Sequence, residues 1–340
     1  MDQKEFLRAG RAQHLGGSVL VLCMNCHEPA RSQNGVPPLA LRSTIQLPHV
    51  HGRIDHLAMD PRTHNVFIAA LGNNSVEVVD LGKGDRVASI TGIEEPQGIV
   101  LIPGDGSVLV TSGGDGSCAF YGTDDLLLKR TIHLDGDADN VRYEPSLERL
   151  FVGHGDGGIA VIDARTFAVL TDIPLGGHPE SLQVDARRKR LFVNVPERRE
   201  VDVIDLVTSA VVAHWPLTVA TANYPMALDT ADQLVIVGCR AGRKLLVYTY
   251  AGLLQQSLDG PGDMDDLFYD GAKRTLIAVG GDGTVALFLR TAESKFAASG
   301  IVKTRAGART AALVPEERIL LLAVPARNEE PAALWLEEWK

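Results

Sequence analysis

The chain is long and apolar enough to fold around a substantial core, with 340 residues of which 45% are hydrophobic. Its 43 acidic residues outnumber its 33 basic ones and give a formal net charge of -10, which argues against a surface that follows a nucleic-acid backbone. No stretch approaches the roughly 20 apolar residues of a membrane helix, and four cysteines are too few for a disulfide scaffold.

Residues 1–38 differ from the rest of the chain and predict a leader. The run GGSVLVLCM at 16–24 follows two arginines, as in a secretory signal, but it is short and two acidic residues precede it. We therefore expect a degenerate signal segment that is poorly ordered or packed on the surface. It favours a periplasmic or secreted protein and leaves a cytoplasmic location open.

The leader also contains a complete haem-attachment pattern. CMNCH at 23–27 matches C-x-x-C-H, in which two thiols bond the haem and the histidine ligates iron. The regular strand pattern begins near Pro38, so few residues are available to enclose a haem. We therefore interpret Cys23, Cys26 and His27 as a chance match and disfavour an electron carrier.

From about residue 39 onward, one unit of strands recurs seven times. Its copies open at Arg53, Glu95, Asp137, His178, Asn223, Asp263 and Ala308. Successive openings are 42, 42, 41, 45, 40 and 45 residues apart, within the window of about 40 to 50 residues that is typical of four-stranded propeller blades. In the first unit the strands HLAMD, NVFIAA, SVEVVD and RVASIT are separated by turns rich in Gly, Asn and Asp, as hairpins require.

The seventh unit ends one strand short, which predicts how the ring closes. The segment LALRSTIQLP at 39–48 resembles the outer strands LLLKRTIHLD and FAVLTDIPLG of other units. We predict that it completes the last blade and so protects an otherwise unpaired sheet edge. The sequence thus predicts an all-β fold, a single seven-bladed β-propeller over residues 39–340 with four-stranded antiparallel blades.

The second and third strands of the units carry a family resemblance. The segments NVFIAALGNNSVEVVD, RLFVGHGDGGIAVID and RLFVNVPERREVDVID resemble the YVTN-repeat bacterial β-propellers. The resemblance covers nearly the whole predicted propeller and implies the fold and an exported or periplasmic location. It implies no particular activity. WD40 propellers are the alternative class, but the WD and GH signatures are absent and aromatic residues make up only 5%.

Polar residues recur where each unit begins and in the loop between its second and third strands. In a propeller the first strands line the central shaft and both positions open on one face, so we expect an axial funnel. The candidate metal ligands are His56, Asp139, Asn140, Asp265 and Asp266. The other candidate funnel residues are Asp55, Gln97, Asp137, His154, Asn223, Tyr224 and Arg240.

An excess of carboxylates in this funnel favours a bound cation, because without one some of the acids would hold protons at neutral pH. Carboxylate and amide oxygens suit Ca²⁺ or Mg²⁺, whereas neighbouring histidines suit Zn²⁺ or Mn²⁺, so the identity of the metal stays open. A purely structural interpretation competes with this one. In it, each acid pairs with an arginine, such as Asp55 with Arg53, Asp139 with Arg142 and Asp265 with Arg309, and the histidines are simply hydrogen-bonded.

The sequence favours a metal-dependent hydrolase of a small ester, lactone or phosphoester, partly by analogy with other propeller hydrolases. A divalent ion would acidify a bound water, with His178 or Glu180 moving the proton and Arg309 as a third catalytic candidate. The alternative is a non-catalytic propeller of the cell envelope that binds a small molecule or a protein. We expect a small-molecule partner and no nucleic acid, and the oligomeric state stays open.

Overall fold

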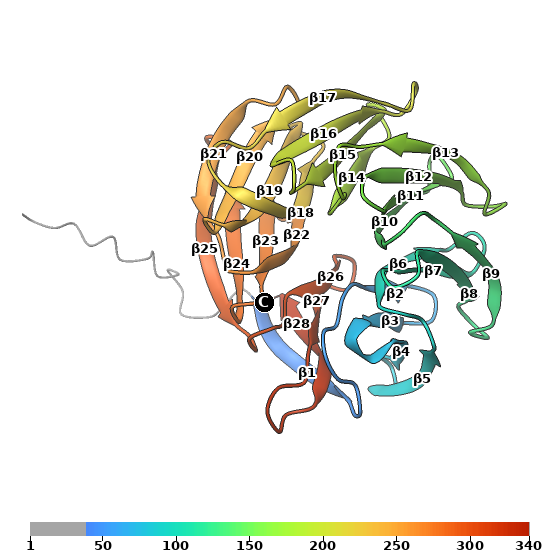
Figure 1. Cartoon of the computed structure of the whole chain (residues 1–340). Coiled ribbons are helices and arrows are strands. Elements are labelled where there is room, and N and C mark those ends of the chain that lie inside the picture. The colour runs from blue at the N-terminus through green and yellow to red at the C-terminus, as the bar shows by residue number, and fades with distance from the viewer. Residues whose placement is uncertain (1–38, 340) are drawn as a thin grey trace, which may run out of the picture. The chain divides into compact units, whose positions relative to one another are not determined.

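Over residues 39–339, which the computed structural model describes, twenty-eight strands form seven four-stranded sheets that surround a common axis like the blades of a propeller (Figure 1). Neighbouring strands of each sheet are antiparallel. The predicted all-β, seven-bladed fold is confirmed. The predicted leader and its C-x-x-C-H motif at 23–27 lie outside the described residues.

Within each of the first six blades the strands follow chain order from the axis outward (Figure 1). Blade one comprises β2 (Leu57–Asp60), β3 (Asn65–Ala70), β4 (Ser75–Asp80) and β5 (Asp85–Thr91), with a single 3₁₀ turn, η1 (Leu71–Asn73), between its middle strands. Blade two comprises β6 (Pro96–Ile102), β7 (Ser107–Ser112), β8 (Ser117–Gly122) and β9 (Leu128–His133). Blade three comprises β10 (Ala138–Glu144), β11 (Arg149–His154), β12 (Gly158–Asp163) and β13 (Val169–Pro174).

The second half of the ring repeats this arrangement. Blade four comprises β14 (Leu182–Asp185), β15 (Arg190–Val195), β16 (Glu200–Asp205) and β17 (Ala210–Pro216). Blade five comprises β18 (Thr221–Asp229), β19 (Leu234–Ala241), β20 (Lys244–Thr249) and β21 (Leu254–Asp259). Blade six comprises β22 (Met264–Asp270), β23 (Thr275–Gly280), β24 (Thr284–Arg290) and β25 (Phe296–Lys303).

Blade seven is built from both ends of the described chain, as predicted. It contains β26 (Thr310–Val314), β27 (Ile319–Val324), β28 (Ala332–Trp339) and, as its outer strand, β1 (Leu39–Leu47). β1 pairs antiparallel with β28 along its length, from Leu39 opposite Trp339 to Leu47 opposite Ala332. Hydrogen bonds of a regular sheet therefore join the two ends and close the ring.

The core lies between the blades because the middle strands are apolar on both faces. In β3, Phe67 packs with Val108 of blade two, whereas the next residue, Ile68, packs with Leu321 of blade seven. Fully burying each such side chain contributes about 1.5–3 kcal/mol. Seven such interfaces make a rigid ring that fixes the polar residues of the inner strands. Within residues 39–339, no helix is long and apolar enough to cross a membrane.

Candidate functional site

Irregular strand pairing positions the residues at the mouth of the shaft. Among the described strands, the register breaks near the start of four inner strands, namely β6, β10, β18 and β22. In β10 the break lies between Ala138 and Val141, so Asp139 and Asn140 have no regular partner on β11. Such β-bulges re-aim side chains and are common beside active sites. The bulge places both polar residues at the mouth of the shaft.

Arginines neutralise the acids on one side of the funnel. Arg53 Nη2 lies 2.6 Å from Asp55 Oδ2, and Arg309 Nε lies 2.8 Å from Asp265 Oδ2. Arg309 also contacts Asp263 at 3.0 Å, and Arg240 forms an ion pair with Asp265. On this arginine-paired side the acids are held by arginines, as the structural interpretation of the sequence expected. Two of the expected pairs, Asp55 with Arg53 and Asp265 with Arg309, are present.

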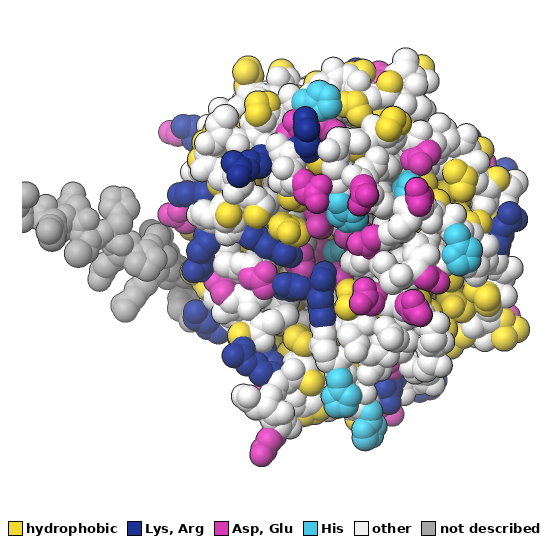
Figure 2. Space-filling view, viewed as in Figure 1, with side chains coloured by type: hydrophobic (Ala, Val, Ile, Leu, Met, Phe, Trp, Pro, Cys, Tyr) yellow, Lys and Arg dark blue, Asp and Glu magenta, His cyan; other side chains and the backbone are white. Residues whose placement is uncertain are grey.

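The opposite side contains a cluster formed by Asp139, His178 and Glu180, which has no arginine or lysine ion pair within 4.0 Å among the described residues. One ligand atom from each residue lies within 4.8 Å of the other two, close enough for the three to hold a metal ion. His178 Nε2 is 3.8 Å from Asp139 Oδ2 and 4.0 Å from Asp137 Oδ2. In Figure 2, Lys and Arg gather on one side of the central hollow and Asp and Glu on the other.

Backbone carbonyls of the loop between β11 and β12 and of β15 hold the cluster in place. His178 Nδ1 lies 2.6 Å from the Gly155 carbonyl oxygen, so the Nδ1–H donates there and leaves Nε2 facing the carboxylates. The N–H of Glu180 donates to the Asn194 carbonyl at 2.9 Å. A backbone carbonyl bound to the far nitrogen is the usual support of a metal-ligating histidine.

The electrostatics of the cluster favour protons or a cation. Burial raises the pKa of Glu180 to about 8, and the Asp139 and Asp265 carboxylates add to this rise. The Asp139 carboxylate raises the pKa of His178 to about 9. Burial also raises the pKa of Asp137. At neutral pH the cluster therefore carries protons that a metal ion would displace.

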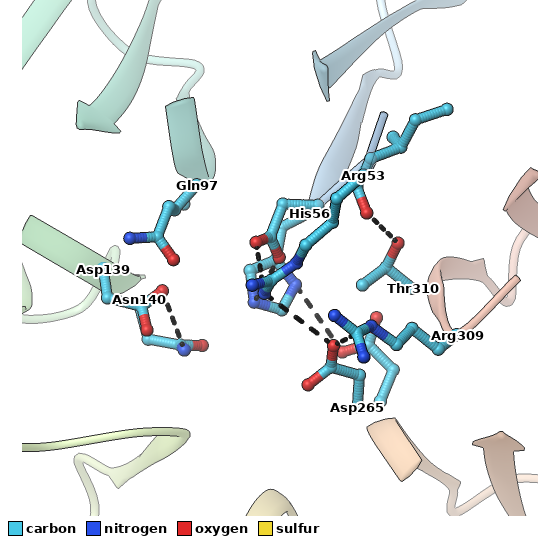
Figure 3. Close-up of polar contacts among 12 residues, drawn as sticks. Arg53, His56, Gln97, Asp139, Asn140, Asp265, Arg309 and Thr310 are labelled. Atoms are coloured by element: carbon cyan, nitrogen blue, oxygen red, sulfur yellow. Dashed lines mark hydrogen bonds and ion pairs between the residues drawn. The ribbon is translucent and has the colours of Figure 1, made fainter. Parts of the chain in front are cut away.

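Asn140 supplies an independent indication of a ligand. Its side chain is buried, and its Nδ2 lies 3.3 Å from Asp139 Oδ1. Its Oδ1 has no hydrogen-bond partner among the described residues. Figure 3 shows the Asn140 carboxamide projecting toward the centre of the funnel. A buried acceptor left unpaired costs about 1–3 kcal/mol, so a cation or donor in the funnel would relieve this cost.

His56 and Asp266, also expected as ligands, lie in a deeper layer. His56 Nδ1 is 3.7 Å from Asp266 Oδ1, and its Nε2 is 3.7 Å from Asp55 Oδ1. Burial opposes protonation of His56, but the Asp266 carboxylate outweighs it and raises the pKa of His56 to about 10. Burial raises the pKa of Asp55 to about 7. His56 thus lies between two acids, and the Asp266 carboxylate favours its protonated form.

The remaining predicted residues surround these groups. Gln97 donates to Asp137 at 2.7 Å, and Asn223 is buried and donates to the Glu200 carbonyl at 2.9 Å. The Tyr224 ring lies under the Arg240 guanidinium, 3.6 Å from its carbon to the ring centroid. His154 lies within 3.2 Å of the Asp135 carbonyl oxygen. None of these residues belongs to the Asp139 cluster.

A cavity of about 730 Å³ adjoins the cluster and gives a small ligand room to approach. Its lining includes His178, Asp137, His154, Asp172 and Glu197. Its polar walls therefore continue from the Asp139 cluster over blades three and four.

A second cluster escaped the sequence analysis. Glu200 and Asp202 of β16 and His214 of β17 also bring ligand atoms within 4.8 Å of one another. His214 Nδ1 lies 2.6 Å from Asp202 Oδ1, and burial raises the pKa of Asp202. In the sequence, Glu200 and Asp202 are two acids at alternate positions of one strand. A strand with one face in solvent shows the same pattern, so the sequence did not indicate a metal site there.

Comparison with known proteins supports the fold alone. Neither a family model nor a curated protein sequence matches the chain. A chain in the crystal structure of the mitotic checkpoint complex is similar with a TM-score of 0.74 and 15% identity, covering 95% of this chain and 99% of that one. Kuenenia stuttgartiensis hydrazine synthase gives a TM-score of 0.70 and 15% identity, covering 82% and 95%. Membership of the YVTN-repeat family stays a prediction.

Proposed function

We propose that the funnel binds a divalent metal ion through Asp139, His178 and Glu180 and hydrolyses a small ester, lactone or phosphoester there. The observation that carries the proposal is the orientation of His178, whose Nδ1–H is held by the Gly155 carbonyl while Nε2 faces the carboxylates. One imidazole with two carboxylates suits Zn²⁺ or Mn²⁺. Three protein ligands leave a position for water, as in catalytic sites.

The chemistry needs only water as the second reactant. A metal ion held by Asp139, His178 and Glu180 would polarise the carbonyl or phosphoryl oxygen of the substrate and lower the pKa of a water that attacks it. Asp137, which lies 4.0 Å from His178 Nε2, would accept the proton of that water and return it to the leaving oxygen. The products are an acid and an alcohol, or a hydroxy acid from a lactone.

In this proposal His178 and Glu180 act as metal ligands instead of proton carriers. Arg309 lies on the arginine-paired side, where Asp263 and Asp265 already hold it. Its proposed role is to orient the substrate across the funnel.

The same pairing favours a second candidate, a non-catalytic propeller of the cell envelope that binds a small molecule or protein. Arg53, Arg240 and Arg309 each contact a carboxylate. A hydrolase gains rate from donors that are free to stabilise developing negative charge, and these three arginines are already engaged. A periplasmic or secreted location is part of this proposal.

Elemental analysis of the purified protein with an esterase, lactonase and phosphoesterase panel tests both candidates. We expect about one divalent ion per chain, lost in Asp139→Asn and retained in the matched control Asp263→Asn, whose carboxylate is paired with Arg309. A chelator should remove both the metal and the activity. Stoichiometric metal without turnover would support the binding role, and protein without stoichiometric metal after loading would contradict the site.

A further inference from the structure

The shaft contains a second cavity below the funnel. It has a volume of about 480 Å³, which lies in the range of small-molecule sites. His56, Arg142 and Asp266 line it, as do Pro61 and Glu316 of the turns that follow β2 and β26. Those turns lie at the ends of the inner strands opposite the funnel, so this lower cavity extends toward the other face.

Arg142 is the unusual residue of the lower cavity. Its Nη1 donates to the Val141 carbonyl at 2.8 Å, and in the described part of the chain no carboxylate forms an ion pair with it within 4.0 Å. Burial lowers the pKa of Arg142, although the Asp266 and Asp139 carboxylates oppose this effect. Because a half-buried charge without an ion pair is poorly solvated, a guanidinium that lines a cavity is a strong candidate to bind an anion.

Arg142 is the cationic group of the lower cavity that has no ion pair among the described residues. Asp266 is occupied by His56 and by the N–H of Ala311, which donates to its Oδ2 at 2.7 Å. The Asp266 carboxylate raises the pKa of His56, so these two groups form an ion pair with each other. The Arg142 guanidinium therefore stays available for an anion, and Glu316 lies at the far end of the cavity.

The rest of the wall mixes polar and apolar groups, with Ser181 and Gln183 among the polar ones. Its apolar residues include Leu57, Met59, Ile99, Met226, Leu267 and Leu313. A small ligand with one anionic end on Arg142 and a short apolar chain against these residues fits the cavity. A carboxylate matches the planar guanidinium by accepting two parallel hydrogen bonds.

We propose that the lower cavity is a binding site for a small monocarboxylate with a short aliphatic chain, its carboxylate on Arg142 and its chain against the apolar residues of the wall. The site lies below the Asp139 cluster, shares no residue with it and does not depend on a metal. It therefore goes beyond the proposed function and stands or fails separately.

Isothermal titration of the full-length, metal-free protein with hexanoate tests this proposal. We expect saturable binding of hexanoate, with hexylammonium and hexan-1-ol binding at least about tenfold more weakly because they cannot accept the charged hydrogen bonds. Metal-loaded protein should bind hexanoate at least as tightly, because a metal ion on Asp139 offsets a carboxylate that acts on Arg142. No saturable binding of hexanoate at millimolar concentration would overturn the proposal.

Two variants locate the site. Arg142→Gln should weaken hexanoate binding at least about tenfold, whereas the matched Arg142→Lys should retain part of the affinity. Ala312→Phe, which fills the lower cavity without changing charge, should also abolish binding. Thermal unfolding would verify that each variant is folded. Hexanoate affinity unchanged in both folded Arg142→Gln and folded Ala312→Phe would place binding elsewhere and contradict the proposal.

Discussion

His178 and Glu180 show how single residues control the funnel. Each holds a proton near neutral pH because its surroundings raise its pKa. Burial raises the pKa of Glu180, and the Asp139 carboxylate raises the pKa of His178. The protonated forms compete with a metal ion for the same atoms. Occupancy of the Asp139 cluster is therefore coupled to pH.

Metal affinity should rise with pH. The pKa values of about 8 for Glu180 and about 9 for His178 mean that two protons leave as the metal binds. Below both values the apparent affinity should increase by up to about tenfold per pH unit for each proton displaced. Calorimetric titration with Zn²⁺ or Mn²⁺ between pH 6.5 and 9 measures this. An affinity that is constant over that interval would contradict the assignment of these ligands.

Glu180 should also make stability depend on pH. Its folded-state pKa is raised, so the folded protein favours the protonated carboxyl, and this stabilisation is lost as pH rises from about 4.5 through about 8. Glu180→Gln removes the titration and should be more stable than the wild type at pH 8 by roughly 2 kcal/mol, with a smaller difference at pH 5.

Denaturant unfolding at both pH values measures the difference. The exposed Glu329→Gln serves as the control and should change little at either pH. A Glu180→Gln variant with no greater advantage at pH 8 than at pH 5 would show that Glu180 is not held in its protonated form.

The inner strands show what the sequence could and could not predict at the level of elements. The regular spacing of the units predicted the seven four-stranded blades. The polar openings placed the candidate residues at the starts of the inner strands, but not at which depth of the shaft each would lie. The bulge after Ala138 was not predictable, because it depends on pairing with β11 and not on residue type. For the same reason Arg142, expected to pair with Asp139, instead lines the lower cavity.

The bulge in β6 gives a test of this positioning. A Cβ added at Gly98 would lie 2.4 Å from the Asp139 carbonyl oxygen and 2.6 Å from Thr111 Oγ1. Gly98→Ala should therefore displace the backbone of Asp139, cost about 1–3 kcal/mol of stability and weaken metal binding.

The matched control is Gly104→Ala, in a turn where an added Cβ meets nothing within 4 Å. Thermal unfolding and metal titration of both variants make the comparison. Equal behaviour of the two variants would show that the β6 bulge does not position Asp139.

At the scale of the whole molecule, ring closure holds the funnel together. The period of the units and the missing last strand were enough to predict that β1 completes blade seven. The division of the funnel into an arginine-paired side and an acidic side was not predictable, because it depends on which side chains meet between blades. Asp265, for example, was expected as a metal ligand and lies between Arg240 and Arg309.

Breaking the closure should destabilise the whole propeller. Ile45 of β1 is buried in the cluster between blades seven and one and lies opposite Leu334. Ile45→Asp would bury an unpaired charge and should cost about 3–5 kcal/mol. Thr44→Asp, on the exposed side of the same strand, should cost far less. Denaturant unfolding that gave the same loss for both would contradict the role of β1 in closure.

Anomalous diffraction at the absorption edge of Zn or Mn, from crystals loaded with that metal, tests the central claim most directly. We expect one strong peak in the funnel, about 2.0–2.2 Å from His178 Nε2 and from carboxylate oxygens of Asp139 and Glu180. A loaded crystal with no peak at these three residues, or with its peak only at Glu200, Asp202 and His214, would contradict the account.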